Sequence, residues 1–256
     1  MAQDFKSPRI QANPIPTRFL KYCIMKKQVV LLPALLCTKE IFINQIHALQ
    51  DVADFHTPDL GTTDSVEEQA YDILKTLPET FCLCGISMGG YVAFEILRQA
   101  PERVSNLLLL DTTALPDNPE KEQSRLDIMQ KARTHGIQSV VPDVLASVVA
   151  PAYRSLPQLL RFMEFMAQTI GTERFCNQEK IIMSRPDSTP DLPSIRCPAI
   201  VAAGALDNTT PPETMRFWAQ KIPQAQFDII PDCGHLSVLE NPQPATALFK
   251  RWLCNM

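Results

Sequence analysis

The residues that could do chemistry centre on a serine between two glycines, in the segment GISMG at positions 85–89. An apolar run that predicts a strand precedes this segment, and a run with helical spacing follows it. A serine at such a sharp strand-to-helix turn has a strained backbone, which raises its hydroxyl above the sheet. The helix N-terminus also supplies free N–H groups where an oxyanion would form. The segment therefore predicts that Ser87 is a nucleophile.

A nucleophilic serine needs a general base, and the chain contains four histidines. His235 follows the last predicted strand in a short loop, and open α/β sheets bind ligands beyond the carboxyl ends of their strands. His135 lies beside Gly136 in a helical region and is the second candidate. His47 lies within a predicted helix, and His56 ends a predicted strand. We therefore expect His235 to be the base.

The base needs an acid to orient it, and two aspartates qualify. Asp207 lies directly after a predicted strand, in the segment GALDNTTP at positions 204–211. Asp111 ends another predicted strand at the same edge of the sheet and is the alternative acid. Glycine usage supports Asp207, because five of the eight glycines lie in the loops of Ser87, Asp207 and His235, where tight turns would shape a site.

Short apolar runs alternate with segments of helical spacing along most of the chain. The predicted strands are 28–32, 51–56, 81–84, 106–110, 198–203 and 226–230. Between the early strands, the predicted helices are 40–50, 65–77 and 88–99. Strands that are apolar throughout and alternate with helices indicate a parallel sheet covered on both faces. We therefore predict an α/β fold with a mostly parallel central sheet and helices on both of its faces.

One region interrupts this alternation. Residues 112–192 contain no convincing strand, and their apolar spacing predicts helices at 121–134, 138–149 and 156–168. The simplest division is an α/β core with an inserted helical cap. The core comprises residues 28–111 and 193–256, the cap residues 112–192. Residues 1–27 carry six basic side chains and one acid, and we expect them to form an N-terminal extension that could be partly disordered.

The insertion would cover the site. Its apolar side chains could line a pocket for an acyl chain, although Phe and Met at helical spacing are more often core. These side chains are Leu159, Phe162, Met163, Phe165 and Met166. Arg154 and Arg161 could meet an anionic group of a substrate, although exposed arginines are usually only solvated.

The composition excludes several classes of protein. The net charge of −4 argues against a dedicated nucleic-acid binder, and the chain has no run of about 18 apolar residues that could span a membrane. Eight irregularly spaced cysteines indicate free thiols in a reducing compartment, so we expect a cytoplasmic location. Cys82 and Cys84 lack further ligands at metal spacing, so no metal site is expected. Nothing in the sequence indicates an oligomeric state.

From residue 28 to the C-terminus, the chain resembles the α/β-hydrolase superfamily, in the branch that bears a cap. The resemblance rests on the nucleophile elbow around Ser87, the pattern Gly-x-x-Asp-x-x-Thr-Pro around Asp207, and Gly234-His235 followed by Glu240-Asn241-Pro242. These motifs occur in the Ser, Asp, His order that the family shows. The resemblance implies an α/β-hydrolase fold and a Ser87–His235–Asp207 catalytic triad that needs no metal or organic cofactor.

The resemblance also implies an oxyanion hole. One donor would be the backbone N–H of Met88, and the other that of Leu35, in the loop at 33–37. Family members commonly have His-Gly in that loop, and this chain reads PALLC. A backbone donor does not depend on its side chain, but Ala34 reaches the backbone angles of glycine less easily. The hairpin that usually begins the family's sheet has one candidate strand here, at 19–24.

These expectations describe a serine hydrolase that cleaves small carboxylic esters or thioesters through an acyl-enzyme. They resemble carboxylesterases, including those that remove methyl esters from carrier-bound acids. Two alternatives stay open. One is a carbon–carbon bond hydrolase or lyase of the same superfamily, and the other is a non-catalytic ligand receptor on the same fold. In each case the expected partner is a small molecule.

Overall fold

The computed structural model describes residues 26–254 and contains a six-stranded sheet in the order β2-β1-β3-β4-β5-β6. Every neighbouring pair of strands is parallel. The strands are β1 (Lys27–Leu32), β2 (Ala53–His56), β3 (Phe81–Ile86), β4 (Val104–Leu110), β5 (Ala199–Gly204) and β6 (Ala225–Ile230). The prediction of an α/β fold with a parallel sheet is confirmed.

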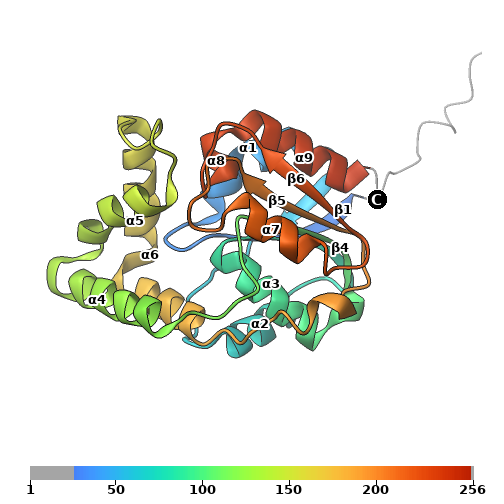
Figure 1. Ribbon diagram of the computed structural model, residues 1–256, viewed down its shortest axis with the longest axis horizontal. Helices are drawn as coiled ribbons and strands as arrows, with labels where there is room; N and C mark the ends of the chain where they lie inside the picture. Colours follow the sequence, from blue (N-terminus) through green and yellow to red (C-terminus); the bar gives the residue numbers. More distant parts are fainter. Residues whose placement is uncertain (1–25, 255–256) are drawn as a thin grey trace, which may run out of the picture.

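Strand residues alternate between two hydrophobic cores, because successive side chains point to opposite faces of a sheet. Val29 and Leu31 join the core on one face, and Val30 and Leu32 join the core on the other. Strands that are apolar along their whole length thus contribute side chains to the cores on both faces of the sheet. The first face is covered by α1 (Ile43–Leu49) and α9 (Pro242–Cys254), and the second by α2 (Val66–Leu74), α3 (Met88–Gln99) and α7 (Pro212–Ala219) (Figure 1).

The strand order contains one reversal, between β1 and β3. From β1 the chain crosses to β2 at one edge and then returns past β1 to β3, from which the sheet grows in the opposite direction. At such a reversal the loops after two adjacent strands diverge and open a crevice at the carboxyl ends of the strands. The topology therefore places a crevice between the loop at 33–38 and the turn at Ser87.

Three helices form the insertion between β4 and β5: α4 (Pro119–His135), α5 (Val141–Val148) and α6 (Pro157–Met183). Figure 1 shows α4 and α5 to one side of the sheet. The helix predicted to end at residue 168 instead continues to Met183, across a break at Gly171 with a φ of 74°. Beyond that break, Ile181 and Ile182 pack in the same core as α2 and α3. The end of the insertion is therefore anchored to the second face of the sheet, whereas the buried apolar side chains of α4, α5 and the first part of α6 join the core of the first face.

The other differences from the predicted elements lie mostly at their ends. The helix predicted at 40–50 is divided into a 3-10 turn (Lys39–Phe42) and α1, and α2 ends at Leu74. The structure adds α7 and α9, which were not predicted. Each begins with a proline, which fits the first helical position as readily as it fits a loop. Lys27 already pairs with β2, so the predicted extension is one residue too long. Residues 1–25, including the candidate strand at 19–24, lie outside the described residues.

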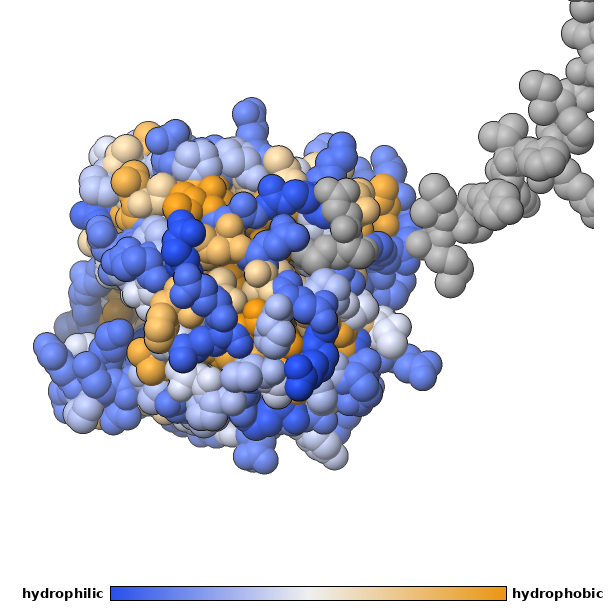
Figure 2. Space-filling model, turned by 45° about the vertical axis from the view of Figure 1, so that its right-hand side comes forward, coloured by the Kyte–Doolittle hydropathy of each residue, from blue (hydrophilic) through white to orange (hydrophobic). Residues whose placement is uncertain are grey.

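The described surface is mainly polar, and the described cysteines are free thiols. Figure 2 shows a face covered mainly by polar residues, with apolar ones between them. The large exposed apolar side chains come from different elements, such as Phe165 in α6 and Phe217 in α7. All cysteines within residues 26–254 are free, and most are buried. None of the helices described by the structure is long and apolar enough to cross a membrane.

Candidate active site

Ser87 lies at the turn between β3 and α3, and its backbone is strained. Its φ of 52° and ψ of −117° lie in a region that residues other than glycine rarely adopt. The turn is held by three hydrogen bonds of the Ser87 backbone. The N–H donates to the carbonyl of Leu110 (3.0 Å), and the carbonyl accepts from the Gly90 N–H (2.8 Å) and the Thr112 hydroxyl (2.9 Å). These bonds fix the serine hydroxyl beyond the carboxyl end of β3.

The glycines beside Ser87 are required because backbone segments approach closely there. A Cβ on Gly85 would lie 2.4 Å from the carbonyl oxygen of Gly89. A Cβ on Gly89 would lie 2.0 Å from the carbonyl oxygen of Leu32, just before the loop that carries Leu35. Both distances are far inside van der Waals contact. Any larger residue would therefore push β1, β3 and α3 apart.

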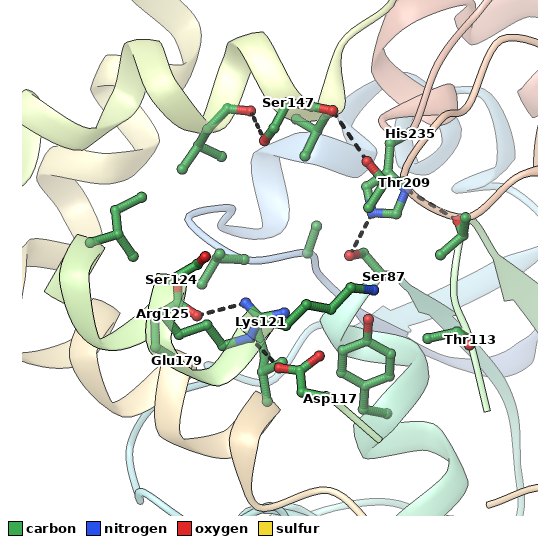
Figure 3. Close-up of a pocket in the computed structure, with 18 of the residues that line it drawn as sticks. Ser87, Thr113, Asp117, Lys121, Ser124, Arg125, Ser147, Glu179, Thr209 and His235 are labelled. Carbon is green, nitrogen blue, oxygen red and sulfur yellow. Dashed lines mark hydrogen bonds and ion pairs between the residues drawn. The ribbon is translucent and has the colours of Figure 1, made fainter. Parts of the chain in front are cut away.

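The structure brings Ser87, His235 and Asp207 together from the loops after β3, β6 and β5. The Nε2 atom of His235 lies 2.7 Å from the Ser87 Oγ. The Nδ1 atom of the same ring lies 2.8 Å from the Asp207 Oδ2. His235 and Asp207 are each only 2% exposed. Figure 3 shows the imidazole facing the serine hydroxyl at the edge of a cavity.

Asp207 is held as an ionised acceptor. Its Oδ1 accepts from the N–H groups of Thr209 (2.8 Å) and Thr210 (3.0 Å), and its Oδ2 accepts from the Thr210 hydroxyl (2.7 Å). Burial alone would raise the pKa of Asp207, but its hydrogen bond to His235 and the bonds from Thr210 lower that pKa below its usual value. Sequence reasoning did not single out Thr210, although the threonine of the Gly-x-x-Asp-x-x-Thr-Pro pattern was the available signal.

Asp111, the alternative acid, forms no hydrogen bond with His235. Its Oδ1 accepts from the Gly204 N–H (2.7 Å), and its Oδ2 is hydrogen-bonded to the Ser237 hydroxyl. Burial, and after it the charge of Asp207, raise the pKa of Asp111 to about 8. Asp111 is therefore mostly protonated at neutral pH. Its two hydrogen bonds connect the ends of β4 and β5 to the residues that follow His235.

The burial of His235 and its contact with Asp207 have opposite effects on its pKa. Burial lowers the pKa of His235, but the hydrogen bond to Asp207 and the charge of Asp207 raise it more, so that the pKa lies above its usual 6.5. An imidazolium formed on this ring would be stabilised by the adjacent carboxylate. The pair Asp207–His235 thus has the electrostatics of a base held by an orienting acid.

Leu35, in the loop at 33–38, lines the same cavity as Ser87. The next N–H, that of Leu36, donates to the Gln178 Oε1 at 3.0 Å. Leu36 is also the residue of this loop with a left-handed backbone, at a φ of 58°. The positive φ of this loop falls on Leu36, so Ala34 does not adopt a backbone conformation that favours glycine. Met88 is the first residue of α3, where N–H groups lack intrahelical acceptors.

Glu240 holds the loop of His235. Its carboxylate accepts from the N–H groups on both sides of the histidine, those of Gly234 (2.9 Å) and Leu236 (3.0 Å). A third bond, from the Ala150 N–H (2.9 Å), ties this loop to the end of α5. Glu240 was not among the predicted site residues, although it belongs to the motif Glu-Asn-Pro after the histidine.

Ser87 and His235 open into a cavity of about 380 Å³ that the insertion partly walls (Figure 3). Among the apolar side chains considered for an acyl pocket, Met163 lines this cavity, whereas Leu159 and Met166 pack in the core and Phe165 is exposed. Arg154 and Arg161 do not line it. Cavities of this size suit small-molecule ligands.

One wall of the cavity carries a buried network of ion pairs. Arg125 of α4 bonds to Asp117 and, at 2.8 Å, to Glu179 of α6. Arg185 contacts Asp117 at 2.6 Å. Both acids have side chains at most 2% exposed. The network joins α4, α6 and the segment after β4, and sequence reasoning did not find it because its members lie far apart in the chain.

The cysteines considered as a metal pair are buried thiols. Cys84 is fully buried and Cys82 nearly so, and burial raises the pKa of both. Across residues 26–254, no three His, Cys, Asp or Glu side chains are arranged to hold a metal ion. Neither cysteine has the environment of a metal ligand.

Comparisons with known proteins agree with this architecture. Residues 27–242 match a family model described as alpha/beta hydrolase fold. A pimeloyl-[acyl-carrier protein] methyl ester esterase of Nitrosomonas europaea is 25% identical over 196 residues, which cover 73% of this chain and 76% of the relative. The 3-oxoadipate enol-lactonase 2 of Acinetobacter baylyi is 24% identical over 173 residues, 67% of this chain and 62% of the relative.

A solved structure is similar over most of both chains. It is that of a thermophilic esterase from Thermogutta terrifontis, bound to malate. The two chains share 30% identity and a TM-score of 0.82, with 90% of each chain covered. The likeness therefore extends beyond the sheet to the inserted helices.

Proposed function

The chain belongs to the alpha/beta hydrolase fold family, and from this premise we propose that it hydrolyses small carboxylic esters or thioesters through an acyl-enzyme on Ser87. The observation that carries the proposal is the continuous hydrogen-bonded row Ser87–His235–Asp207, with separations of 2.7 and 2.8 Å. A serine hydroxyl in contact with a buried imidazole, itself paired with a carboxylate, is the arrangement that makes the hydroxyl nucleophilic.

In the proposed mechanism, the Ser87 Oγ attacks the ester carbonyl while the His235 Nε2 accepts the hydroxyl proton. The negative charge that develops on the carbonyl oxygen is stabilised by the N–H groups of Leu35 and Met88, and one such donor typically contributes ~3 kcal/mol. His235 then gives its proton to the departing alcohol or thiol. Water attacks the acyl-enzyme with His235 again as base, which releases the acid and restores Ser87. Asp207 fixes the ring tautomer and stabilises the imidazolium.

Two observations favour ester hydrolysis over the alternatives. The relatives described above act, by their names, on a methyl ester and a lactone, which favours an ester over a carbon–carbon bond as the scissile group. The intact contact between Ser87 and His235 favours catalysis over a receptor role, because a receptor has no need of an activated hydroxyl. The helical insertion would serve as the cap that closes the site.

Labelling with a fluorophosphonate tests whether Ser87 is nucleophilic. We expect the wild-type protein to be labelled on Ser87, because the attacking hydroxyl is activated by His235, and the Ser87→Ala protein to remain unlabelled. Intact-mass measurement and peptide mapping identify the modified residue. Absence of label on the folded wild type would favour a receptor. A panel of p-nitrophenyl esters, assayed beside acyl thioesters, then identifies the leaving group.

The pH dependence of hydrolysis tests His235 as the base. We expect kcat/KM for a neutral ester to rise with pH and to reach half its maximum above pH 6.5, because only neutral imidazole accepts a proton and the pKa of His235 is raised above that value. The measurement is a pH–rate profile at constant ionic strength. A half-maximum below pH 6.5 would contradict the stabilisation of the imidazolium by Asp207.

A further inference from the structure

The face of α4 that lines the cavity is polar. Lys121, Ser124, Arg125 and Ile128 all line the cavity, and their spacing of three, four and seven residues places them on one side of a helix. Only Met129 and Ala132 of this helix are buried. Arg125 and Ile128 are half-buried against α6 and the core, whereas Lys121 and Ser124 are exposed and polar.

The positive charges on this wall are not all compensated. Arg125 and Arg185 are paired with Asp117 and Glu179, and Asp143 at the cavity rim is paired with Lys131 at 2.5 Å. The ammonium of Lys121 has neither a hydrogen-bond acceptor nor an ion partner among residues 26–254, whereas its backbone N–H donates to the Asn118 side chain at 2.9 Å. Among the Lys and Arg side chains that line the cavity, Lys121 is therefore the one without a partner within residues 26–254.

No acid of residues 26–254 holds the Lys121 side chain. Lys121 is exposed and lies four residues before Arg125 on the same face of α4, a spacing at which like charges repel each other weakly. The acids next to it in sequence, Glu120 and Glu122, do not pair with it. Figure 3 shows its side chain running across the cavity in the direction of Ser87. The ammonium is thus presented to whatever occupies the site.

We propose that Lys121 binds an ionised carboxylate of the substrate, so that the preferred esters carry a second, free carboxyl group. This inference rests on the proposed function and names its substrate class. A carboxylate suits this site better than a phosphate, because the guanidinium groups that would bind phosphate through two parallel bonds, those of Arg125 and Arg185, are already occupied by Asp117 and Glu179. A single ammonium is a point charge suited to a single negative charge.

The test compares two esters that differ by one carboxylate group at the end of the acyl chain: p-nitrophenyl butyrate and the mono-p-nitrophenyl ester of glutaric acid. We expect the wild-type protein to have the higher kcat/KM for the anionic ester. Lys121→Gln should lower the ratio of anionic to neutral kcat/KM by about tenfold, mainly through KM of the anionic ester, because the lost contact is made in the bound ground state as well. The preference should shrink as ionic strength rises.

Arg133→Gln is the matched control, because it removes the same charge from an exposed position on α4 that does not line the cavity. We expect it to leave the ratio unchanged. A ratio that is the same in wild type and Lys121→Gln overturns the proposal, as does an equal loss on both esters. Inhibition by inorganic phosphate that depends on Lys121, without such inhibition by glutarate, would overturn the choice of carboxylate.

A binding measurement separates this inference from the proposed function. Calorimetric titration with glutarate requires no turnover, and we expect binding to wild type that weakens about tenfold in Lys121→Gln, a loss of ~1.4 kcal/mol. If neither ester is hydrolysed but glutarate still binds through Lys121, the proposed function fails and the anion site stands. If neutral esters are hydrolysed and glutarate binding does not depend on Lys121, the anion site fails alone.

Discussion

Replacing His235 with alanine is expected to lower kcat for ester hydrolysis by about 10⁶-fold, the loss typical when the base of a Ser-His pair is removed. The His235 Nε2 lies 2.7 Å from the Ser87 Oγ and is the group placed to accept its proton. Without it, Ser87 remains a weakly nucleophilic alcohol in front of an intact cavity. The measurement is hydrolysis of a p-nitrophenyl ester, with circular dichroism and thermal unfolding to establish that the variant is folded.

His135→Ala is the matched control for this variant. His135 ends α4 on the surface and does not line the cavity, so we expect wild-type turnover. His135 was the second candidate for the base, and the structure does not bring it to the cavity of Ser87. Unchanged turnover in His235→Ala would exclude His235 as the base. A large loss in His135→Ala would reopen the assignment.

Replacing Asp207 with asparagine is expected to lower kcat by about 10⁴-fold, the effect of an isosteric change at the acid of a triad. An asparagine amide cannot stabilise the imidazolium that forms on His235, and its NH₂ group would donate to Nδ1 and so favour the wrong tautomer. Because the Asp207 Oδ2 lies 2.8 Å from Nδ1, the change acts directly on the base. The measurement is steady-state kinetics at a pH above the half-maximum of the wild-type profile.

Asp111→Asn provides the comparison, and we expect a much smaller loss. Burial and the charge of Asp207 raise the pKa of Asp111 to about 8. At neutral pH Asp111 is therefore mostly uncharged, as asparagine is. An asparagine can also accept from the Gly204 N–H and donate to the Ser237 hydroxyl, the two partners of Asp111. The reverse ranking of the two variants would move the orienting acid to the end of β4.

The elements of the core could be predicted because their apolar patterns are local. The helix predicted at 88–99 coincides with α3, and each predicted strand of the sheet is present within two residues of its expected ends. The prediction of helix ends failed where tertiary packing, and not the local apolar pattern, keeps a segment helical. The second half of α6 was missed because Gly171 breaks the periodicity, whereas packing against α2 and α3 keeps the chain helical beyond it.

The sequence favours Asp207 over Asp111 as the acid, but it does not show what surrounds either carboxylate. Both follow strands that end at the same edge of the sheet, so spacing alone makes either a possible partner of His235. The structure distinguishes them through their surroundings. Thr210 and two N–H groups keep Asp207 ionised against the imidazole, while Asp111 is buried beside Gly204 and Ser237. Hydrogen bonds of this kind depend on loops that meet only in the folded chain.

The sequence by itself determined the sheet, the turn that strains Ser87 and the loops that carry Asp207 and His235, because each depends on residues close together in the chain and on the rule that parallel strands end at one edge. The tertiary structure alone decided what faces Ser87 across the cavity. Asp117, Arg125, Glu179 and Arg185 pair only because α6 folds back beneath α4. Because these four side chains pair with one another, none of them is a partner for the Lys121 ammonium. This property depends on contacts between segments far apart in the chain, so the residues next to Lys121 in the sequence do not predict it.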